Sequence, residues 1–538
     1  MKKFFIIFSL ISLFCYQSVS SINNEKALIE STDYVQIILY GQSLGMGWES
    51  PRAITTVPLD GNYMIGDNVL MRYNNNASVL TPLVATVWAN GGEQPIVACV
   101  NSFSKMYKEN VNPNQKFIAM TGGEGGQTIE TLSKESTNSN LYASTFTRIL
   151  DRTLLTLKFM GIGKTVSCPA IIYMQGEYNC NDVNWYGGRG MTPGSDGTID
   201  KDTYKALLLQ LKNNMQTDIM QKYGQKVKPL FFIYQTSGGF IIDKEMPITM
   251  GQLEFANEND DVYLLNPQNA LPHYGGGHLS TNGYRWYGEL MSKTLSNVLV
   301  SKNTFGPIYP ENFSFEGQTI TIDYHVPVPP LVLDTWTNSK ATNYGFVIYK
   351  NNVSLPISKI EITSGNRIVL TFSESLVGKI DVVYAGSTTR GTGNVCDSNI
   401  SNSIYTYFDD SADSKKESYT PQNKNGSKIY GQPYPMQNWS VSYYKSFNVS
   451  TSSIIDVQKV TDNSLVVFKN SNNQIVVNCN KLNDQKGMIT VYNMAGKKLV
   501  SMLSTGTITL VSNIFSPGFY FVTVTTSGNY CEYRSIFI

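Results

Sequence analysis

Residues 38–50 read ILYGQSLGMGWES, an apolar run that ends in a glycine-rich turn around a single serine. With the residues before it, the apolar run becomes YVQIILY at 34–40, a pattern that predicts a buried strand. Ser43 therefore follows directly after a strand. A serine in this position lies either in an ordinary turn or at the edge of a sheet, where its hydroxyl group is available as a nucleophile.

Short apolar runs and longer amphipathic runs alternate between residues 33 and 300. Strands that alternate with helices are joined by crossover connections, so the pattern predicts an α/β fold with three layers, in which helices cover both faces of a largely parallel sheet. The predicted strands are 34–40, 116–121, 169–175, 228–236 and 261–267. The predicted helices are 94–111, 144–161 with Ser144 as its N-cap, 202–224 closed by Gly224, and 280–300.

The pattern changes near residue 301, where runs such as QTITIDYHV and KIEITSGNRIVLTF alternate apolar and polar residues between turns. This alternation predicts β-rich modules. Residues 409–430 are polar and predict a loop. The predicted division of the chain is a signal peptide at 1–21, an α/β domain at 22–300, a β-rich module at 301–446, a linker at 447–462 and a small C-terminal β-sandwich at 463–538.

The N-terminus of the chain predicts an exported protein, and the charge argues against one class of partner. Lys2 and Lys3 precede the apolar run FFIIFSLISLFC and small residues near Ser18 and Ser20, which is the pattern of a secretory signal peptide. The run is too short for a stable membrane span, and no later stretch is apolar enough for one. Charged residues make up 15% of the chain and the net charge is +1. The chain therefore lacks the excess of basic residues that would predict a nucleic-acid partner.

The cysteines predict no metal site. They contain no C-x-x-C pair and no Cys/His cluster with zinc spacing, and no metal or organic cofactor is expected. An oxidising compartment permits disulfides, and Cys479 with Cys531 is a plausible pair because both lie in the last segment. The six cysteines outside the signal peptide are Cys99, Cys168, Cys180, Cys396, Cys479 and Cys531.

A histidine that could act as a general base lies in the loop LPHYGGGHLSTNGYRW, between the last predicted strand and the last predicted helix of the α/β domain. This loop contains His273 and His278. His325, the third histidine of the chain, lies in the β-rich module and is poorly placed. The loop is either an ordinary glycine-rich connection or the element that brings a base to the edge of the sheet.

Four loops of unusual composition follow predicted strands. They contain Ser43, GGEGGQT at 122–128, QGEYN at 175–179, and His278. The carboxyl ends of parallel strands lie along one edge of a sheet, and ligand sites form there. We therefore expect these four loops to meet, and an ordered set of four is more specific than any one glycine-rich turn.

Together these loops resemble the SGNH hydrolase superfamily, and more closely its sialate O-acetylesterase-like branch. YGQSLGMG is similar to the first block of that branch, GGEGGQTIETL to the second, YMQGEYN to the third and GGHLSTNGYRWYGE to the last. The resemblance covers about residues 33–300. It continues into GTGNVCDS at 391–398 and YPMQNWSV at 434–441, which are similar to closing elements of these esterases.

The resemblance implies a secreted serine esterase that removes O-acetyl groups from a carbohydrate, either sialic acid or a plant or host polysaccharide. Ser43 would be the nucleophile and His278 the base. The oxyanion hole would consist of the N–H groups of Ser43 and Gly126, with a side-chain donor from Gln175 or Asn179. Removal of one such donor typically costs about 10²–10³ in rate.

One position departs from the family pattern. The family has an aspartate three residues before its histidine, and this chain has Gly275 there. Three alternatives remain open. A Ser–His dyad works with a backbone carbonyl group as its orienting partner, another acid such as Asp260 or Asp261 reaches the histidine, or the protein is inactive. We favour the dyad, because Ser43, the glycines and His278 are all present.

Other acids and tryptophans on these loops have a structural and a functional interpretation. A pair of carboxylates would suit glycoside hydrolysis, but helix capping or loop hydrogen bonding is the expected role. The tryptophans would line a sugar platform or simply pack. The acids are Glu124, Glu177 and Asp182, and the tryptophans are Trp48, Trp185 and Trp286.

The last segment carries a second resemblance. GMITVYNMAGKKLVSML and SPGFYFVTVTTSGNYCEYRSIFI are similar to a type IX secretion sorting domain. The resemblance implies export by the type IX machinery of a Gram-negative bacterium, with the mature chain secreted or attached to the cell surface. The alternative is another carbohydrate-binding sandwich, and the position at the extreme C-terminus favours sorting.

Two other functions compete with the esterase. The first is a non-catalytic glycan-binding surface protein on a degenerate esterase fold, which Gly275 favours. The second is a lipid or thioester acyl hydrolase of the same superfamily. The first block contains GQS rather than GDS, and the composition is polar and rich in tyrosine, which argues for a carbohydrate substrate.

Overall fold

The computed structural model describes residues 28–75, 78–161, 163–180, 197–241, 243–274, 277–302, 306–409 and 419–450, together with separate strands between 465 and 537. Several predicted features lie outside the described residues. These are the signal peptide, Asp182, Trp185, Gly275 and the side chains of Cys479 and Cys531.

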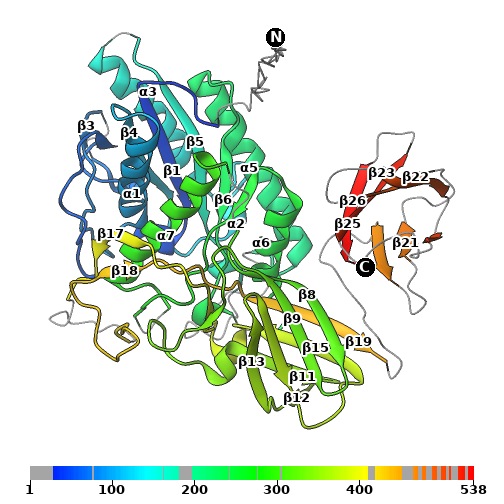
Figure 1. The fold of residues 1–538 in the computed structure, drawn as a ribbon. Coiled ribbons are helices and arrows are strands. Elements are labelled where there is room, and N and C mark those ends of the chain that lie inside the picture. The colour runs from blue at the N-terminus through cyan, green and yellow to red at the C-terminus, as the bar shows by residue number, and fades with distance from the viewer. Residues whose placement is uncertain are drawn as a thin grey trace, which may run out of the picture.

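The α/β part is built on a seven-stranded sheet in the order β3-β2-β4-β1-β5-β6-β7 (Figure 1). The central strand β1 runs parallel to β4 on one side and to β5 on the other, and β3 is antiparallel to β2 at one edge. Every residue of β1 is buried, as expected for a strand covered on both faces. The strands are β1 (Tyr34–Gly41), β2 (Asn62–Ile65), β3 (Leu80–Pro82), β4 (Lys116–Gly123), β5 (Val166–Met174), β6 (Leu230–Ile233) and β7 (Val262–Leu264).

Two groups of helices flank this sheet. The first group is α1 (Pro95–Asn110) and α7 (Thr281–Leu299), which pack against each other. The second is α3 (Arg148–Met160), α5 (Lys201–Tyr223) and α6 (Pro247–Glu258), in which α5 contacts both neighbours. From β1 the chain moves to one side to form β4 and then crosses back to form β5. Because such crossovers are right-handed, the two groups lie on opposite faces, in line with the predicted three layers.

The helix boundaries follow local signals, with two differences from prediction. Gly224 closes α5 in the left-handed conformation, with a φ of 68°, as expected of a C-terminal glycine. Ser144 is not an N-cap: its N–H already donates to the Asn140 carbonyl group, inside a wide helical turn (Tyr142–Thr147) that runs into α3. Helix α6 was not predicted, because Pro247 and Gly251 obscure its pattern; Pro247 in fact occupies the first turn, where its missing N–H has no cost.

The β-rich module consists mainly of two four-stranded sheets, β12-β11-β15-β19 and β13-β14-β9-β8. Burial alternates along strands such as β9, as the period-two pattern predicts. The strands are β8 (Tyr309–Glu316), β9 (Thr319–His325), β11 (Phe346–Lys350), β12 (Val353–Leu355), β13 (Lys359–Ser364), β14 (Arg367–Thr371), β15 (Gly378–Tyr384) and β19 (Tyr443–Val449). The last strand continues past residue 446, where the linker was predicted to follow.

The chain returns from the β-rich module to the α/β part through short strands. The Trp286 indole N–H on α7 donates to the Pro435 carbonyl group over 2.7 Å, and the Ser442 N–H donates to Oε1 of Gln235 over 2.9 Å. Both resembling segments, 391–398 and 434–441, lie in this returning stretch. Its strands are β10 (Val332–Leu333) paired with β16 (Val395–Cys396), and β17 (Asn402–Thr406) paired with β18 (Pro433–Pro435).

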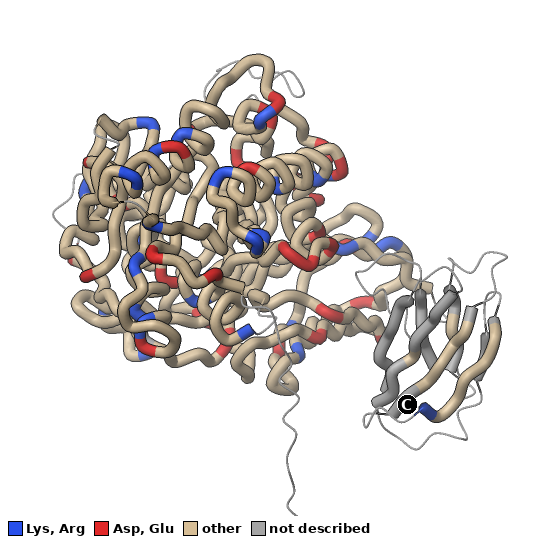
Figure 2. The backbone as a smooth tube through the Cα atoms, turned by 90° about the horizontal axis from the view of Figure 1, so that it is seen from above, with Lys and Arg blue, Asp and Glu red and all other residues tan. Residues whose placement is uncertain are grey.

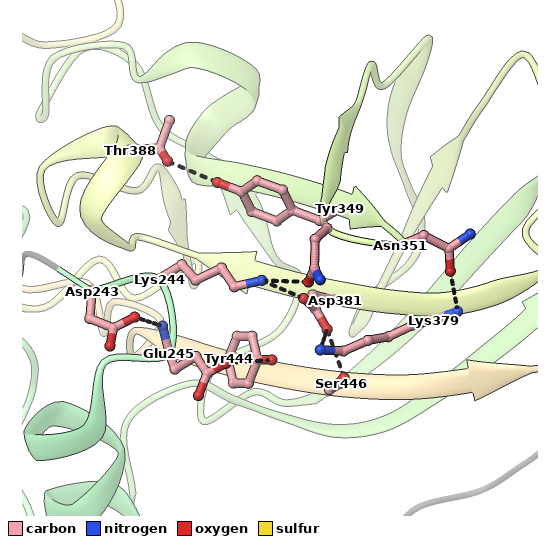
Figure 3. A network of polar contacts seen from close by, with 11 residues as sticks. Asp243, Lys244, Glu245, Tyr349, Asn351, Lys379, Asp381, Thr388, Tyr444 and Ser446 are labelled. Atoms are coloured by element: carbon pink, nitrogen blue, oxygen red, sulfur yellow. Dashed lines mark hydrogen bonds and ion pairs between the residues drawn. The ribbon is translucent and has the colours of Figure 1, made fainter. Parts of the chain in front are cut away.

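A buried ion pair also joins the two parts (Figure 3). Lys244, in the loop before α6, donates to Oδ2 of Asp381 on β15 over 2.8 Å. The Ser446 hydroxyl on β19 donates to Oδ1 of the same carboxylate over 2.7 Å. The Asp381 side chain is 1% exposed, so its charge depends on these partners.

The C-terminal segment forms β-strands, as predicted for 463–538, arranged in a three-stranded sheet β20-β21-β24 and a four-stranded sheet β23-β22-β25-β26. Along the described chain, basic and acidic residues are interspersed (Figure 2). None of the described helices is both long and apolar enough to cross a membrane. The strands are β20 (Leu465–Lys469), β21 (Ile475–Cys479), β22 (Gly487–Asn493), β23 (Lys498–Ser504), β24 (Ile508–Leu510), β25 (Phe519–Thr526) and β26 (Cys531–Phe537).

Candidate active site

The serine turn begins where three strands end side by side. Gly41 at the end of β1 pairs with Gly123 of β4 and with Met174 of β5. A Cβ atom on Gly41 would overlap the Met174 carbonyl oxygen, and one on Gly123 would overlap the Gly41 carbonyl oxygen. Only glycine therefore permits this close approach, and it places Ser43 at the carboxyl edge of the central strand.

Ser43 and His278 are in contact. The Ser43 Oγ lies 2.8 Å from Nε2 of His278, although 235 positions separate the two residues in the chain. Both are largely buried, with 8% and 7% of their surface exposed. The Phe240 ring meets the imidazole edge-on, and the His278 carbonyl group accepts a hydrogen bond from the Tyr274 N–H. This arrangement lets Nε2 accept the serine proton.

A carboxylate faces the other nitrogen of the imidazole. Oε2 of Glu49 lies 3.4 Å from Nδ1 of His278, and the Glu49 side chain is 31% exposed. The sequence analysis did not identify Glu49. No spacing rule connects it to His278. The sequence also does not show that a non-glycine residue adopts a φ of 65° at this position.

The acids considered in the sequence analysis are elsewhere. Asp260 and Asp261 precede β7 and therefore lie at the amino edge of the sheet, opposite Ser43. Asp261 binds Lys212 over 2.8 Å and Lys228 over 2.7 Å, and these contacts, against the effect of burial, lower its pKa to about 2. The suggestion that either aspartate reaches His278 is wrong.

The predicted oxyanion-hole residues lie on adjacent loops. Gly126 follows β4 with a φ of 65°. Within the described residues, the N–H groups of Ser43 and Gly126 have no hydrogen-bond acceptor, so they are available to an incoming oxygen.

The amides of Gln175 and Asn179 are engaged with the protein. Nε2 of Gln175 donates to the Gln127 carbonyl group over 3.1 Å and to Oδ1 of Asn179 over 2.7 Å. Nδ2 of Asn179 donates to Glu130 over 3.2 Å and to the Thr198 carbonyl group over 3.0 Å. In this structure the two side chains stabilise the loop that carries Gly126. Each amide nitrogen already donates to two protein acceptors, so neither is available to an oxyanion.

The glutamate of the third block anchors the serine turn. Nε2 of Gln42 donates to Oε2 of Glu177 over 2.7 Å, and the Tyr234 hydroxyl donates to Oε1. Burial raises the pKa of Glu177 to about 7, although the Tyr234 hydrogen bond opposes this shift. Glu124, by contrast, pairs with Arg72. The two glutamates therefore have structural partners, as expected.

The described tryptophans and the remaining histidines also have identifiable surroundings. Trp286 is fully buried in the core. Trp48 packs edge-on against Trp88, with ring centroids 5.3 Å apart, and lies against Gly125. Trp48 is therefore near the loop that carries Gly126, whereas Trp286 is too deeply buried to form a sugar platform. His325 stacks on Tyr309, and Nδ1 of His273 lies 3.5 Å from the Leu271 carbonyl oxygen, so neither replaces His278.

A polar groove opens beside Gly126. It has a volume of about 710 Å³ and adjoins a second hollow of about 630 Å³. The two share Gln127, Thr131, Thr137 and Asn138, and the Tyr178 ring lines the first. Most of the residues that line the two hollows have hydroxyl or amide side chains, a lining that suits a ligand with many hydroxyl groups.

No family model matches this chain, and no curated protein matches its sequence. Among solved structures, a carbohydrate acetylesterase from Xanthomonas citri matches with a TM-score of 0.43 and 13% identity, over 76% of this chain and 80% of that one. A protein from Arabidopsis thaliana matches with a TM-score of 0.34 and 15% identity, over 50% and 99%. NanS matches with a TM-score of 0.35 and 12% identity, over 51% and 99%. At these scores the likeness is partial.

Proposed function

We propose that this chain is a serine esterase that releases acetate from O-acetylated carbohydrates. The observation that carries the proposal is the 2.8 Å contact between Ser43 and His278 at the carboxyl edge of the central strand. A serine hydroxyl group becomes a strong nucleophile when a histidine accepts its proton, and a covalent acyl-enzyme then divides the hydrolysis into two easier steps.

In the first half-reaction, the Ser43 Oγ attacks the ester carbonyl carbon while its proton moves to Nε2 of His278. The carbonyl oxygen becomes an oxyanion, which the N–H groups of Ser43 and Gly126 stabilise. The bond to the sugar oxygen then breaks, and the sugar leaves with the proton from His278. In the second half-reaction, His278 accepts a proton from water, the resulting hydroxide attacks the acetyl-serine, and acetate leaves as Ser43 regains a proton.

The groove beside Gly126 is the proposed site of the sugar. Among the described residues, the charged side chains along its first hollow are the carboxylates Glu130 and Glu135. Arg72, in the second hollow, is paired with Glu124. An anionic sugar such as a sialic acid would lie beside like charges here, so a neutral acetylated oligosaccharide or polysaccharide is the better fit.

We also propose that the chain is exported, with residues 1–21 as the signal peptide and 463–538 as a type IX sorting domain. The sequence patterns at both ends support this. Its test is the location of the chain in a type IX-competent bacterium, with and without residues 463–538. Retention of the shortened chain inside the cell is expected, and its normal secretion would contradict the sorting role.

The first experiment is acetate release by the mature chain from an aryl acetate, from acetylated neutral oligosaccharides and from O-acetylated sialic acid. Ser43→Ala and His278→Ala should each abolish release. Ser144→Ala is the control, because within the described residues its hydroxyl group has no hydrogen-bond partner and it lies outside the site.

Each outcome distinguishes a different function. Preference for sialic acid would contradict the neutral-sugar proposal. No release from any substrate by the folded protein would favour the non-catalytic glycan-binding protein, and release only from long acyl esters or thioesters would favour the lipid or thioester hydrolase.

A further inference from the structure

We propose that Glu49 is the positioning residue of His278 and completes a Ser43–His278–Glu49 triad. The inference rests on the proposed esterase function of the same site. The carboxylate that the family supplies with its aspartate would come here from Glu49, which lies in the loop that follows Ser43. The three side chains form a continuous series, with 2.8 Å from Oγ to Nε2 and 3.4 Å from Nδ1 to Oε2.

The chemistry requires such a partner at Nδ1. A neutral imidazole accepts a proton at Nε2 only when its own proton is on Nδ1, and an acceptor beside Nδ1 favours that tautomer. A carboxylate there also stabilises the imidazolium that forms during each half-reaction. A distance of 3.4 Å is long for a hydrogen bond, but catalytic hydrogen bonds often tighten only when substrate is bound.

The backbone of the serine turn is held so that Glu49 reaches the histidine. Glu49 has a φ of 65°, which costs a non-glycine residue about 1–2 kcal/mol. Two contacts fix this conformation: the Glu49 N–H donates to the Asn90 carbonyl group over 2.7 Å, and the Trp48 carbonyl group accepts from the Tyr284 hydroxyl over 2.9 Å. Backbone strain maintained in this way is a feature of functional sites.

Among the described residues, the other groups near His278 do not occupy the position beside Nδ1. Both oxygens of Glu177 are bonded, one to Gln42 and one to Tyr234. Asp261 is at the opposite edge of the sheet with its two lysines. Phe240 presents only its ring, and the Tyr284 hydroxyl donates to the backbone.

The test compares Glu49→Gln, Glu49→Ala and Glu49→Asp in the mature chain, with kcat and KM for an aryl acetate measured between pH 5 and 9. Glu49→Gln should lower kcat by roughly 10²–10⁴, the upper value being that of the equivalent change in chymotrypsin, with little change in KM. The acid limb of its kcat/KM profile should move to lower pH, because the imidazolium loses its negative neighbour. Glu49→Asp should retain more activity than Glu49→Ala.

Glu258→Gln is the matched control, since it removes an exposed carboxylate on α6 that pairs with Lys205. Its activity should equal that of the wild type. If Glu49→Gln keeps the wild-type kcat and acid limb while Ser43→Ala is inactive, the triad is overturned and the esterase stands with a dyad. If Ser43→Ala is also active, the proposed function itself fails.

A measurement on the unchanged protein avoids any folding defect of these variants. The ¹⁵N chemical shifts of His278, assigned against His273→Gln and His325→Gln, report its tautomer at neutral pH. We expect the proton on Nδ1. A proton on Nε2 would overturn the proposal.

Discussion

The Gln42 side chain donates a 2.7 Å hydrogen bond to Glu177, and both residues are almost completely buried, with 2% and 1% of their surface exposed. Gln42 directly precedes Ser43, and Glu177 begins the short helix α4 (Glu177–Cys180) after β5. The contact therefore fixes the Ser43 turn to the loop that follows the neighbouring strand β5. This structural contact accounts for the glutamate in the third block and requires no role for Glu177 in bond cleavage.

Glu177→Ala should destabilise the protein by about 3 kcal/mol, because it leaves the Gln42 amide and the Tyr234 hydroxyl buried without their partner. It should also lower kcat, since Ser43 is no longer held. Urea denaturation followed by acetate-release kinetics checks both effects. A variant with wild-type stability and kcat would show that this carboxylate does not anchor the turn.

The stability of the protein should depend on pH through two of its buried glutamates, Glu177 and Glu289. Burial raises the pKa of both Glu177 and Glu289 to about 7, opposed by hydrogen bonds from Tyr234 and Ser102 respectively. A carboxyl group with a raised folded-state pKa contributes its stabilisation fully below the unfolded value, near 4.5, and loses it as the pH rises through 7.

The free energy of unfolding of the wild type should therefore fall, relative to that of Glu177→Gln or Glu289→Gln, between pH 5 and 8. The difference is at most roughly 3 kcal/mol for each residue, at about 1.4 kcal/mol for each pKa unit. Urea titrations across this range measure it. Parallel pH profiles of the wild type and both variants would mean that these carboxyl groups titrate normally.

Gly126→Ala should reduce activity more than stability. The φ of 65° is costly for alanine, whereas the added Cβ would meet only the Tyr178 ring, at 3.9 Å. The loop should shift to relieve the strain and move the N–H donor, at a loss of about 10²–10³ in kcat.

Gly224→Ala is the matched control for this change. Gly224 has a φ of 68° and nothing within 4 Å of an added Cβ, so its backbone strain is similar, but it lies at the end of α5 away from the site. It should lose about 1 kcal/mol of stability and no kcat. Equal kcat losses in the two variants would contradict an oxyanion role for Gly126.

Lys244→Met should destabilise the protein by about 2 kcal/mol, because it leaves the buried Asp381 carboxylate without its main cation. Burial opposes ionisation of Asp381, but Lys244 and Ser446 outweigh it and lower its pKa. This contribution is present above the unfolded pKa and is lost as the pH falls through the lowered folded value. Thermal unfolding at pH 3 and pH 7 should show a larger difference between variant and wild type at pH 7 than at pH 3.

Lys359→Met is the control for Lys244→Met. Lys359 pairs with Glu361 on the surface, where both side chains are largely exposed. Such a pair contributes less than about 1 kcal/mol. A loss as large as that of Lys244→Met would mean that burial does not govern the stabilisation of these ion pairs.

Local patterns were sufficient to predict much of the α/β part. The run at 34–40 predicted the central strand, because a strand covered on both faces is apolar at nearly every position, and Gly224 predicted the end of α5. The Ser43–His278 contact was also predicted, because both residues follow strands of one parallel sheet and such ends meet at one edge.

Glu49, the proposed third member of the site, could not be predicted by the same reasoning. Glu49 depends on the backbone conformation of a single residue, and its distance from His278 depends on how two loops pack. The favoured dyad had only a backbone acceptor, and Asp260 and Asp261 were candidates only because they are the nearest acids before His278 in the sequence. Sequence distance says little about side-chain contacts between loops.

The contacts of helix α7 with residues far along the chain determine when the α/β part can complete its folding. Trp286, fully buried, bonds to a carbonyl group 149 positions further along the chain, and its neighbour Arg285 bonds to Tyr434. When the ribosome has synthesised the whole α/β part, the residues that cover α7 have therefore not yet been synthesised. Until Pro435 has emerged, α7 exposes aromatic surface, and the α/β part cannot complete its folding before the module that follows it has been made.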